Sequence, residues 1–381
     1  MTSWACDPAA LALPVPRTTF NVASAASPEV SMPARAALAV PGDLATLTGG
    51  YIYDRRLLSE LRAQGRDVAH IALGSSFPDP SAADMEDAAR QLAAVPADCP
   101  VMIDGLAMGA MDRAVLSGMR APIVAMVHHP LAHEGSLPPA RRDHLHRTET
   151  ENLTCAAHVV VPSPHTAALL VSDYGVTADR ITIARPGTDR PLGQVAKFDP
   201  PLILSVGIQI PRKGHDVLIR ALAEVADRPW QAVIAGSAFD ADHAALLARL
   251  VADLGLGGRV RLAGRVPGGE LARLYGQSGI FALATRFEGY GIVFDEAMAH
   301  GLPIVTCATG AVPDTVAPGA GLLVPPDDAP AFAAALARVL DDAALRETMA
   351  AASALAGAAL PGWDATARLV GAVFDRALAD G

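Results

Sequence analysis

The chain has 381 residues and a formal net charge of −10, with 18% charged and 51% hydrophobic residues. This length favours two domains, and the acidic balance argues against nucleic acid as the main partner. Much of the hydrophobic fraction is alanine, and the sequence has no stretch of ~20 unbroken apolar residues that would span a membrane.

The first residues, 1–35, are rich in alanine, proline and serine. Several prolines and Asp7 interrupt the apolar core that a secretory signal needs, so we expect a loose extension here. The cysteines are scattered without the CxxC spacing of a metal or redox motif. Reduced thiols of this kind are typical of a cytoplasmic protein, which is the localisation we expect. The cysteines are Cys6, Cys99, Cys155 and Cys307.

Short apolar runs alternate with helical patterns from residue 34 onward. The first helical pattern, 51–64, carries apolar residues at helical spacing, and Gly65 follows it as a helix-terminating residue. Alternation of this kind predicts a parallel, doubly wound sheet with helices on both faces. The runs expected to be buried strands are 34–40, 67–73, 99–104, 121–127, 158–163 and 181–186.

The same alternation restarts near residue 200, after a proline-rich linker at 187–200. The sequence therefore predicts an α/β protein with two Rossmann-like domains, 36–195 and 196–358. The C-terminal segment, 359–381, contains a predicted helix that packs on either domain or crosses between them. Ligands of such folds bind at the carboxyl ends of the strands, so we expect a cleft between the domains. The second set of predicted strands is 200–207, 231–237, 259–264, 279–285, 302–307 and 321–326.

Two glutamates, Glu288 and Glu296, bracket a glycine-bearing loop between a predicted strand and a predicted helix. Free N–H groups at the start of a helix, together with the helix dipole, form an anion site suited to a diphosphate. A carboxylate can accept hydrogen bonds from two neighbouring sugar hydroxyls. For either glutamate alone, an ordinary acidic residue at a helix start is the simpler interpretation. For the whole arrangement we favour a functional site.

The spacing from Glu288 to Glu296 resembles the E-x7-E signature of the retaining glycosyltransferases of family four, which have the two-domain GT-B fold. Other segments agree with this family in order and spacing, and the resemblance covers roughly residues 35–330. Each segment is weak evidence alone, but the set is specific. These segments are 48–51 (TGGY), 159–170 (VVVPSPHTAALL), 203–222 (ILSVGIQIPRKGHDVLIRAL), 263–264 (AG) and 271–291 (LARLYGQSGIFALATRFEGYG).

The resemblance implies a role for each residue that matches the family's motifs. Glu296 would bind the ribose of the nucleotide, and Glu288 would contact the donor sugar or orient the loop. The backbone of the helix start would hold the diphosphate, and glycines elsewhere would let the backbone approach the donor. The helix-start residues are Gly291, Ile292 and Val293, and the other glycines are Gly49, Gly50, Gly207 and Gly236.

Lysine is rare in this chain, because Lys197 and Lys213 are the only lysines among 30 basic residues. The resemblance implies that Lys213 neutralises the departing diphosphate, where a fixed cation contributes most to the rate. Many family members carry an arginine directly after the glycine of this segment, but here Ile208 stands at that position. We therefore expect Arg212 to supply the second cation. A solvated pair in a turn is the alternative for Arg212 and Lys213.

A second cluster, His128-His129-Pro130 followed by His133 and Glu134, comes directly after a predicted strand. Neighbouring residues of an extended chain point to opposite sides, and Pro130 disfavours a continuous helix, so we expect no metal here. The resemblance implies a functional histidine in this region, and we assign His128 to it as a hydrogen-bonding group. His129 in that role, or a purely structural histidine, are the alternatives.

The resemblance implies a metal-independent, retaining glycosyltransferase of the hexosyltransferase type. It would move a sugar from a nucleotide-sugar donor in the second domain to a glycan, glycolipid or small-molecule acceptor in the first. The donor is a substrate, so no cofactor is expected. The competing hypotheses are a nucleotide-sugar epimerase, a phosphorylase or another GT-B enzyme, and a catalytically silent nucleotide-sugar-binding subunit. The locally basic segment 140–147 would permit peripheral contact with the inner membrane face, or form an ordinary solvated helix face.

Overall fold

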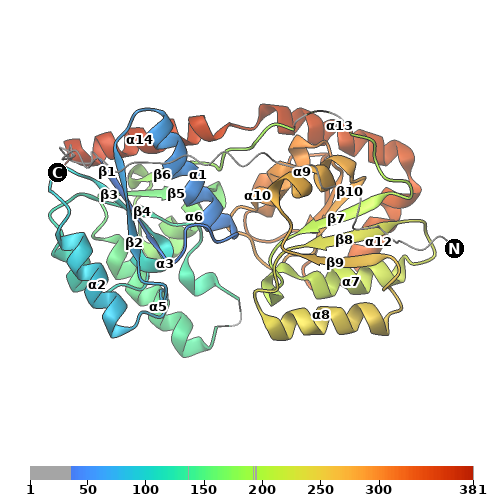
Figure 1. Cartoon of the computed structure of the whole chain (residues 1–381), viewed down its shortest axis with the longest axis horizontal. Coiled ribbons are helices and arrows are strands. Elements are labelled where there is room, and N and C mark those ends of the chain that lie inside the picture. Colours follow the sequence, from blue (N-terminus) through green and yellow to red (C-terminus); the bar gives the residue numbers. More distant parts are fainter. Residues whose placement is uncertain (1–35, 136, 192, 194, 381) are drawn as a thin grey trace, which may run out of the picture. The chain divides into compact units, whose positions relative to one another are not determined.

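The computed structural model describes residues 36–135, 137–191, 193 and 195–380, so the predicted extension 1–35 lies outside the described residues. Two parallel six-stranded sheets organise this part of the chain (Figure 1). Helices cover both faces of each sheet, as the alternating pattern predicts.

The first sheet has the strand order β2-β1-β3-β4-β5-β6. Every residue of β1, β3, β4 and β5 is buried, which explains why these strands are continuous apolar runs. Between β1 and β3 the order of connection reverses, and this reversal is the topological switch point of the sheet. The strands are β1 (Ala36–Pro41), β2 (Val68–Leu73), β3 (Val101–Asp104), β4 (Ile123–Met126), β5 (His158–Val161) and β6 (Ile181–Ile183).

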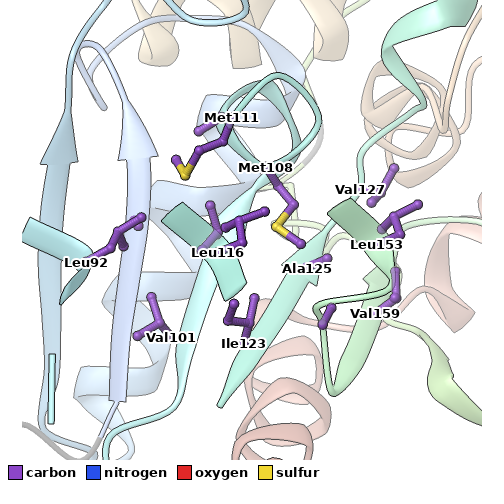
Figure 2. Packing of buried hydrophobic residues seen from close by; sticks show 14 of the residues in the cluster. Leu92, Val101, Met108, Met111, Leu116, Ile123, Ala125, Val127, Leu153 and Val159 are labelled. Atoms are coloured by element: carbon purple, nitrogen blue, oxygen red, sulfur yellow. The ribbon is translucent and has the colours of Figure 1, made fainter. Parts of the chain in front are cut away.

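Helices α2 to α6 pack on one face of the first sheet. Figure 2 shows apolar side chains of α2, α3, α4 and α5 beside those of β3, β4 and β5. Helix α1 packs on the other face and begins at Gly49, two residues before the predicted start. It ends before Gly65, whose φ of +82° is the left-handed conformation expected there. The helices are α1 (Gly49–Ala63), α2 (Ala82–Ala93), α3 (Gly105–Met108), α4 (Arg113–Ser117), α5 (Pro139–Leu153) and α6 (Pro164–Tyr174).

The second sheet has the order β12-β11-β10-β7-β8-β9, so its switch point lies between β7 and β10. Helices α7, α8 and α12 cover one face, and α9 and α10 cover the other. The strands are β7 (Leu202–Val206), β8 (Gln231–Ala235), β9 (Val260–Gly264), β10 (Ile280–Leu283), β11 (Ile304–Cys307) and β12 (Gly321–Val324). The helices are α7 (His215–Glu224), α8 (Ala241–Asp253), α9 (Gly268–Gln277), α10 (Ile292–Ala299), α11 (Val312–Thr315), α12 (Ala329–Asp341) and α13 (Ala343–Ala359).

The last helix, α14 (Trp363–Ala379), packs on α1 and completes the core on that face of the first sheet. The chain enters this helix beside Gly187, where an added Cβ would lie 2.2 Å from the backbone nitrogen of Trp363. The sequence left open whether this helix packs on either domain or crosses between them. In the structure it packs on the first sheet. None of the helices in the described part of the chain combines the length and hydrophobicity needed to cross a membrane.

Candidate active site

Two loops leave the carboxyl ends of β7 and β10, the strands on either side of the switch point of the second sheet. The loop after β7 contains a 3-10 turn, Pro211–Lys213. The loop after β10 binds this turn directly, because the backbone N–H of Arg286 donates to the carbonyl of Arg212 at 2.8 Å. The hydroxyl oxygen of Thr285 lies 3.2 Å from the same carbonyl oxygen. The two predicted motifs are therefore one structural unit.

Lys213 and Glu288 form a buried ion pair, with Nζ 2.7 Å from Oε1 and side-chain exposures of 14% and 6%. The hydroxyl of Thr285 also donates to Oε1 of Glu288, at 3.0 Å. Burial raises the pKa of the Glu288 carboxyl, but Lys213 and Arg212 outweigh burial and lower it below its usual value. Glu288 is therefore ionised in the folded protein, and the lysine and glutamate predicted from separate motifs lie together.

Arg212 connects this pair to the other half of the chain. Its Nε donates to Oε1 of Glu134 at 2.9 Å, and its Nη1 donates to the carbonyl of Phe287 at 3.2 Å. Oε2 of Glu134 lies 2.7 Å from Nε2 of His129. Burial raises the pKa of Glu134, yet the hydrogen bonds and charges of His129 and Arg212 lower it to about 2. His129 therefore belongs to a hydrogen-bonded network with Glu134 and Arg212.

Helix α10 begins directly after Gly291, whose φ is +91°. The first N–H groups of a helix have no partner within it, so the backbone at Ile292 and Val293 can donate hydrogen bonds to an anion. Glu296 lies one turn further along, where it accepts a hydrogen bond from the hydroxyl of Tyr275 at 2.7 Å. Burial raises the pKa of Glu296 to about 7.

Two of the predicted donor-site glycines allow close packing beneath Lys213. A Cβ on Gly207 would lie 3.2 Å from the Lys213 side chain, and one on Gly236 would lie 1.8 Å from the carbonyl oxygen of Gly207. In the first half of the chain, Gly50 faces His128, because its Cβ would be 3.1 Å from Cδ2 of that ring. An added Cβ on Gly49 would meet nothing within 4 Å.

His128 lies beside the loop after β10, since a Cβ on Gly289 would be 2.4 Å from the carbonyl oxygen of His128. Its side chain contacts two carboxylates that the sequence analysis did not select. Nε2 lies 3.2 Å from Oδ1 of Asp54 and 3.4 Å from Oδ2 of Asp104. The sequence pattern marks both residues as unusual. Asp104 ends a buried strand, and Asp54 interrupts the apolar face of α1.

Asp54, Asp104 and His128 also meet the distance requirement for sharing a metal ion. Among the residues that the structure describes, their ligand atoms lie within 4.8 Å of one another. Hydrogen bonds between a histidine and two carboxylates account for the same spacing. The expectation that the protein works without a metal or cofactor stays a prediction.

Two regions of the chain match families of known proteins, and together they contain His128 and the loops after β7 and β10. Residues 193–355 match the family described as Glycosyl transferases group 1, and residues 101–190 match Glycosyltransferase Family 4. The chain is 33% identical over 240 residues to a D-inositol 3-phosphate glycosyltransferase from Kineococcus radiotolerans, with 55% of each chain covered. The chain spans about half the length of the curated relatives that it matches.

Solved structures of low sequence identity share the fold. Sucrose-phosphate synthase from Thermosynechococcus elongatus superposes with a TM-score of 0.77 at 23% identity, covering 91% of this chain and 100% of the other. Anabaena HepE in complex with UDP and glucose gives a TM-score of 0.72 at 16% identity, covering 90% of this chain and 100% of the other. These similarities confirm the predicted GT-B fold.

Proposed function

Because the chain carries a group 1 and a family 4 glycosyltransferase region on a GT-B fold, we propose that it transfers a sugar from a nucleoside-diphosphate sugar to an acceptor. The observation that carries the proposal is the pair of cations, Arg212 and Lys213, held at the switch point of the second sheet. Ligands of open α/β sheets bind at this place, and two cations there suit a diphosphate.

In the proposed donor complex, the diphosphate lies between Lys213 and the start of α10. Arg212 contacts Glu134 and Lys213 contacts Glu288, so the phosphates of a bound donor would share these two cations with the carboxylates. Glu296 accepts hydrogen bonds from the ribose hydroxyls, in exchange for or beside its bond to Tyr275. Glu288 contacts the donor sugar or keeps Lys213 in place.

The proposed reaction retains the configuration of the sugar and needs no metal ion. The acceptor oxygen bonds to the anomeric carbon on the face from which the diphosphate departs, while the bond from that carbon to the diphosphate oxygen breaks. The proton of the acceptor hydroxyl passes to the departing phosphate. Arg212, Lys213 and the N–H groups at the start of α10 stabilise the charge that develops on the leaving group.

We place the acceptor beside His128, on the first half of the chain. A relative acts, by its name, on inositol 3-phosphate, and this supports a polyhydroxylated acceptor, either a small molecule, a glycan or a glycolipid headgroup. Exposed Arg142 and Arg147 on α5 would provide peripheral contact with an anionic membrane if the acceptor is a lipid.

The proposal can be tested with a panel of nucleotide sugars. Each sugar is tested first for thermal stabilisation of the protein and then for turnover. A bound donor should raise the melting temperature, because a ligand stabilises the folded state by RT ln(1 + [L]/Kd). The stabilising donor should then be consumed with a polyol acceptor, and the product should keep the anomeric configuration. Conversion of the donor without any acceptor would indicate an epimerase, and stabilisation without any turnover would indicate a binding subunit. Either result would overturn the proposal.

A further inference from the structure

We propose that Asp54 and Asp104 are positioning residues that hold the imidazole of His128 protonated and in one orientation at the switch point of the first sheet. The assignment of a role in sugar transfer rests on the proposed function. The existence of the charged cluster does not, because it follows from the geometry of the folded chain alone.

Three separate elements bring these side chains together. Asp54 comes from α1, which follows β1, and Asp104 ends β3, the neighbour of β1 on the other side of the switch point. His128 lies just beyond β4, in the loop that contacts Gly289. The cluster therefore lies at the switch point of the first sheet, as Lys213 and Glu288 lie at the switch point of the second sheet.

The ring of His128 is also held by its apolar surroundings. Gly50 lies against its Cδ2 edge, where any larger residue would meet the ring. Tyr53 packs edge-on at a centroid distance of 5.2 Å and is fixed by a hydrogen bond to the carbonyl of Ala184 at 2.9 Å. With Nε2 directed to the carboxylates, Nδ1 is the ring nitrogen left to donate a hydrogen bond to a substrate.

The charges of the cluster favour an imidazolium. Asp54 and Asp104 are 1% and 2% exposed, and two buried carboxylates in contact need a neighbouring positive charge or a shared proton. Burial lowers the pKa of His128, but both carboxylates raise it, and the net direction is upward. Burial and the neighbouring Asp54 raise the pKa of Asp104, and the charge of His128 opposes that shift.

Other titratable groups around the cluster respond to the same carboxylates. The pKa of Tyr51, on α1, is raised to about 12 by burial and then by Asp104 and Asp54. Burial lowers the pKa of His70, on β2, while Asp54 opposes that shift. The backbone N–H of Leu106, in α3, donates to Oδ1 of Asp104 at 2.9 Å and keeps that carboxyl group oriented.

The test follows the titration of His128 by NMR in the full chain labelled on its histidines, with His128→Gln used to assign the resonance. In the wild type, His128 should titrate above 6.5, and Asp54→Asn or Asp104→Asn should lower its pKa by roughly one unit. Glu149→Gln is the matched control, since Glu149 is equally buried on α5 of the same half but binds the N–H of Leu131. The control should leave the His128 titration unchanged.

The second readout is the pH profile of sugar transfer with the donor found in the panel. The high-pH decline of kcat should move to lower pH in both asparagine variants, and the control should keep the wild-type profile. A His128 pKa below 6.5 in the wild type, or one unaffected by both asparagine variants, would overturn the proposal. So would a transferase whose pH profile does not move, or a metal ion bound at one per chain and lost in Asp104→Asn.

The two proposals fail separately. If no nucleotide sugar binds or reacts, the proposed function fails, and the titration of His128 still shows whether the two carboxylates hold its proton.

Discussion

At the level of single residues, the charges of Lys213 and Glu288 compensate one another. Each is largely buried, and their contact of 2.7 Å compensates two charges that would be costly to bury alone. A donor diphosphate would enter this pair with a charge of the same sign as Glu288. The pair therefore fixes the Lys213 ammonium beside Glu288, at the place where we propose that the leaving group departs.

Replacing Lys213 by alanine should weaken donor binding or turnover by about 2–4 kcal/mol, because the leaving group loses its nearest fixed cation. Donor affinity by calorimetry and kcat/KM from initial rates measure the loss. Lys197→Ala is the matched control, since Lys197 is the other lysine of the chain and lies exposed in the segment between the sheets. Equal donor affinity and rate in the two variants would contradict the site assignment.

The raised pKa of Glu296 predicts that donor affinity depends on pH. Burial raises its pKa to about 7, and only the ionised carboxylate accepts hydrogen bonds from both ribose hydroxyls. Donor affinity should therefore increase as the pH rises through about 7. In Glu296→Gln the affinity should be lower and should lack this rise. A rise of the same size in both proteins would assign the titration to another group.

At the level of elements, Arg286 holds the active-site loops in place. Its guanidinium contacts both carboxylate oxygens of Asp216 at the start of α7, at 3.0 and 2.9 Å, and Asp327 after β12 at 2.7 Å. It also donates to the carbonyl of Pro211, in the turn that carries Lys213. The sequence indicates no role for Arg286, and its contacts in the structure connect three elements.

Arg286→Lys should loosen this turn, because an ammonium cannot form the two parallel hydrogen bonds to Asp216. We expect donor affinity to fall by about 1 kcal/mol, since these contacts are partly exposed and solvent screens them. Arg228→Lys removes a similar two-bond contact, to Asp341, away from the active-site loops. Calorimetric titration of the donor should show normal affinity for Arg228→Lys, and an unaltered affinity for Arg286→Lys would argue against this role of Arg286.

At the scale of the whole molecule, the last helix of the chain completes the core of the first sheet. Trp363, at its start, is 5% exposed and packs edge-on against Tyr53 at a centroid distance of 5.7 Å. Since Tyr53 in turn packs on His128, the end of the chain supports the cluster at the first switch point. Two aromatic contacts therefore connect α14 with the side chain of His128.

Trp363→Ala should lower the free energy of unfolding by roughly 3–5 kcal/mol, because it leaves a large cavity beneath α1. Leu369→Ala, on the exposed side of the same helix at 48% exposure, should change it by about 0.5 kcal/mol or less. Chemical denaturation followed by circular dichroism compares them. Equal losses in the two variants would mean that α14 does not depend on its packing against the first sheet.

Contacts between the two halves also involve neutral groups. The hydroxyls of Ser163 and Thr166, at the start of α6, donate to the carbonyl of Gly289 at 2.7 and 3.2 Å. With the pair of Glu134 and Arg212, they bring the loop after β10 against the first half. Residues that are separated by 123 and 126 positions in the sequence thus meet at one loop.

The sequence determined the local architecture and the motifs from which the candidate site is proposed. Hydrophobic runs bounded by glycine and proline predicted the strands, because burial on both faces of a parallel sheet leaves a strong local pattern. The motifs that contain Lys213 and Glu288 were recognisable because each is a continuous segment that resembles a family motif and follows a predicted strand. Only the tertiary structure decided which charges meet. Strand order and packing between distant segments bring Glu134 to Arg212, and Asp54 and Asp104 to His128. They also bring α14 to the first sheet. A local sequence pattern contains no information on strand order or on such packing.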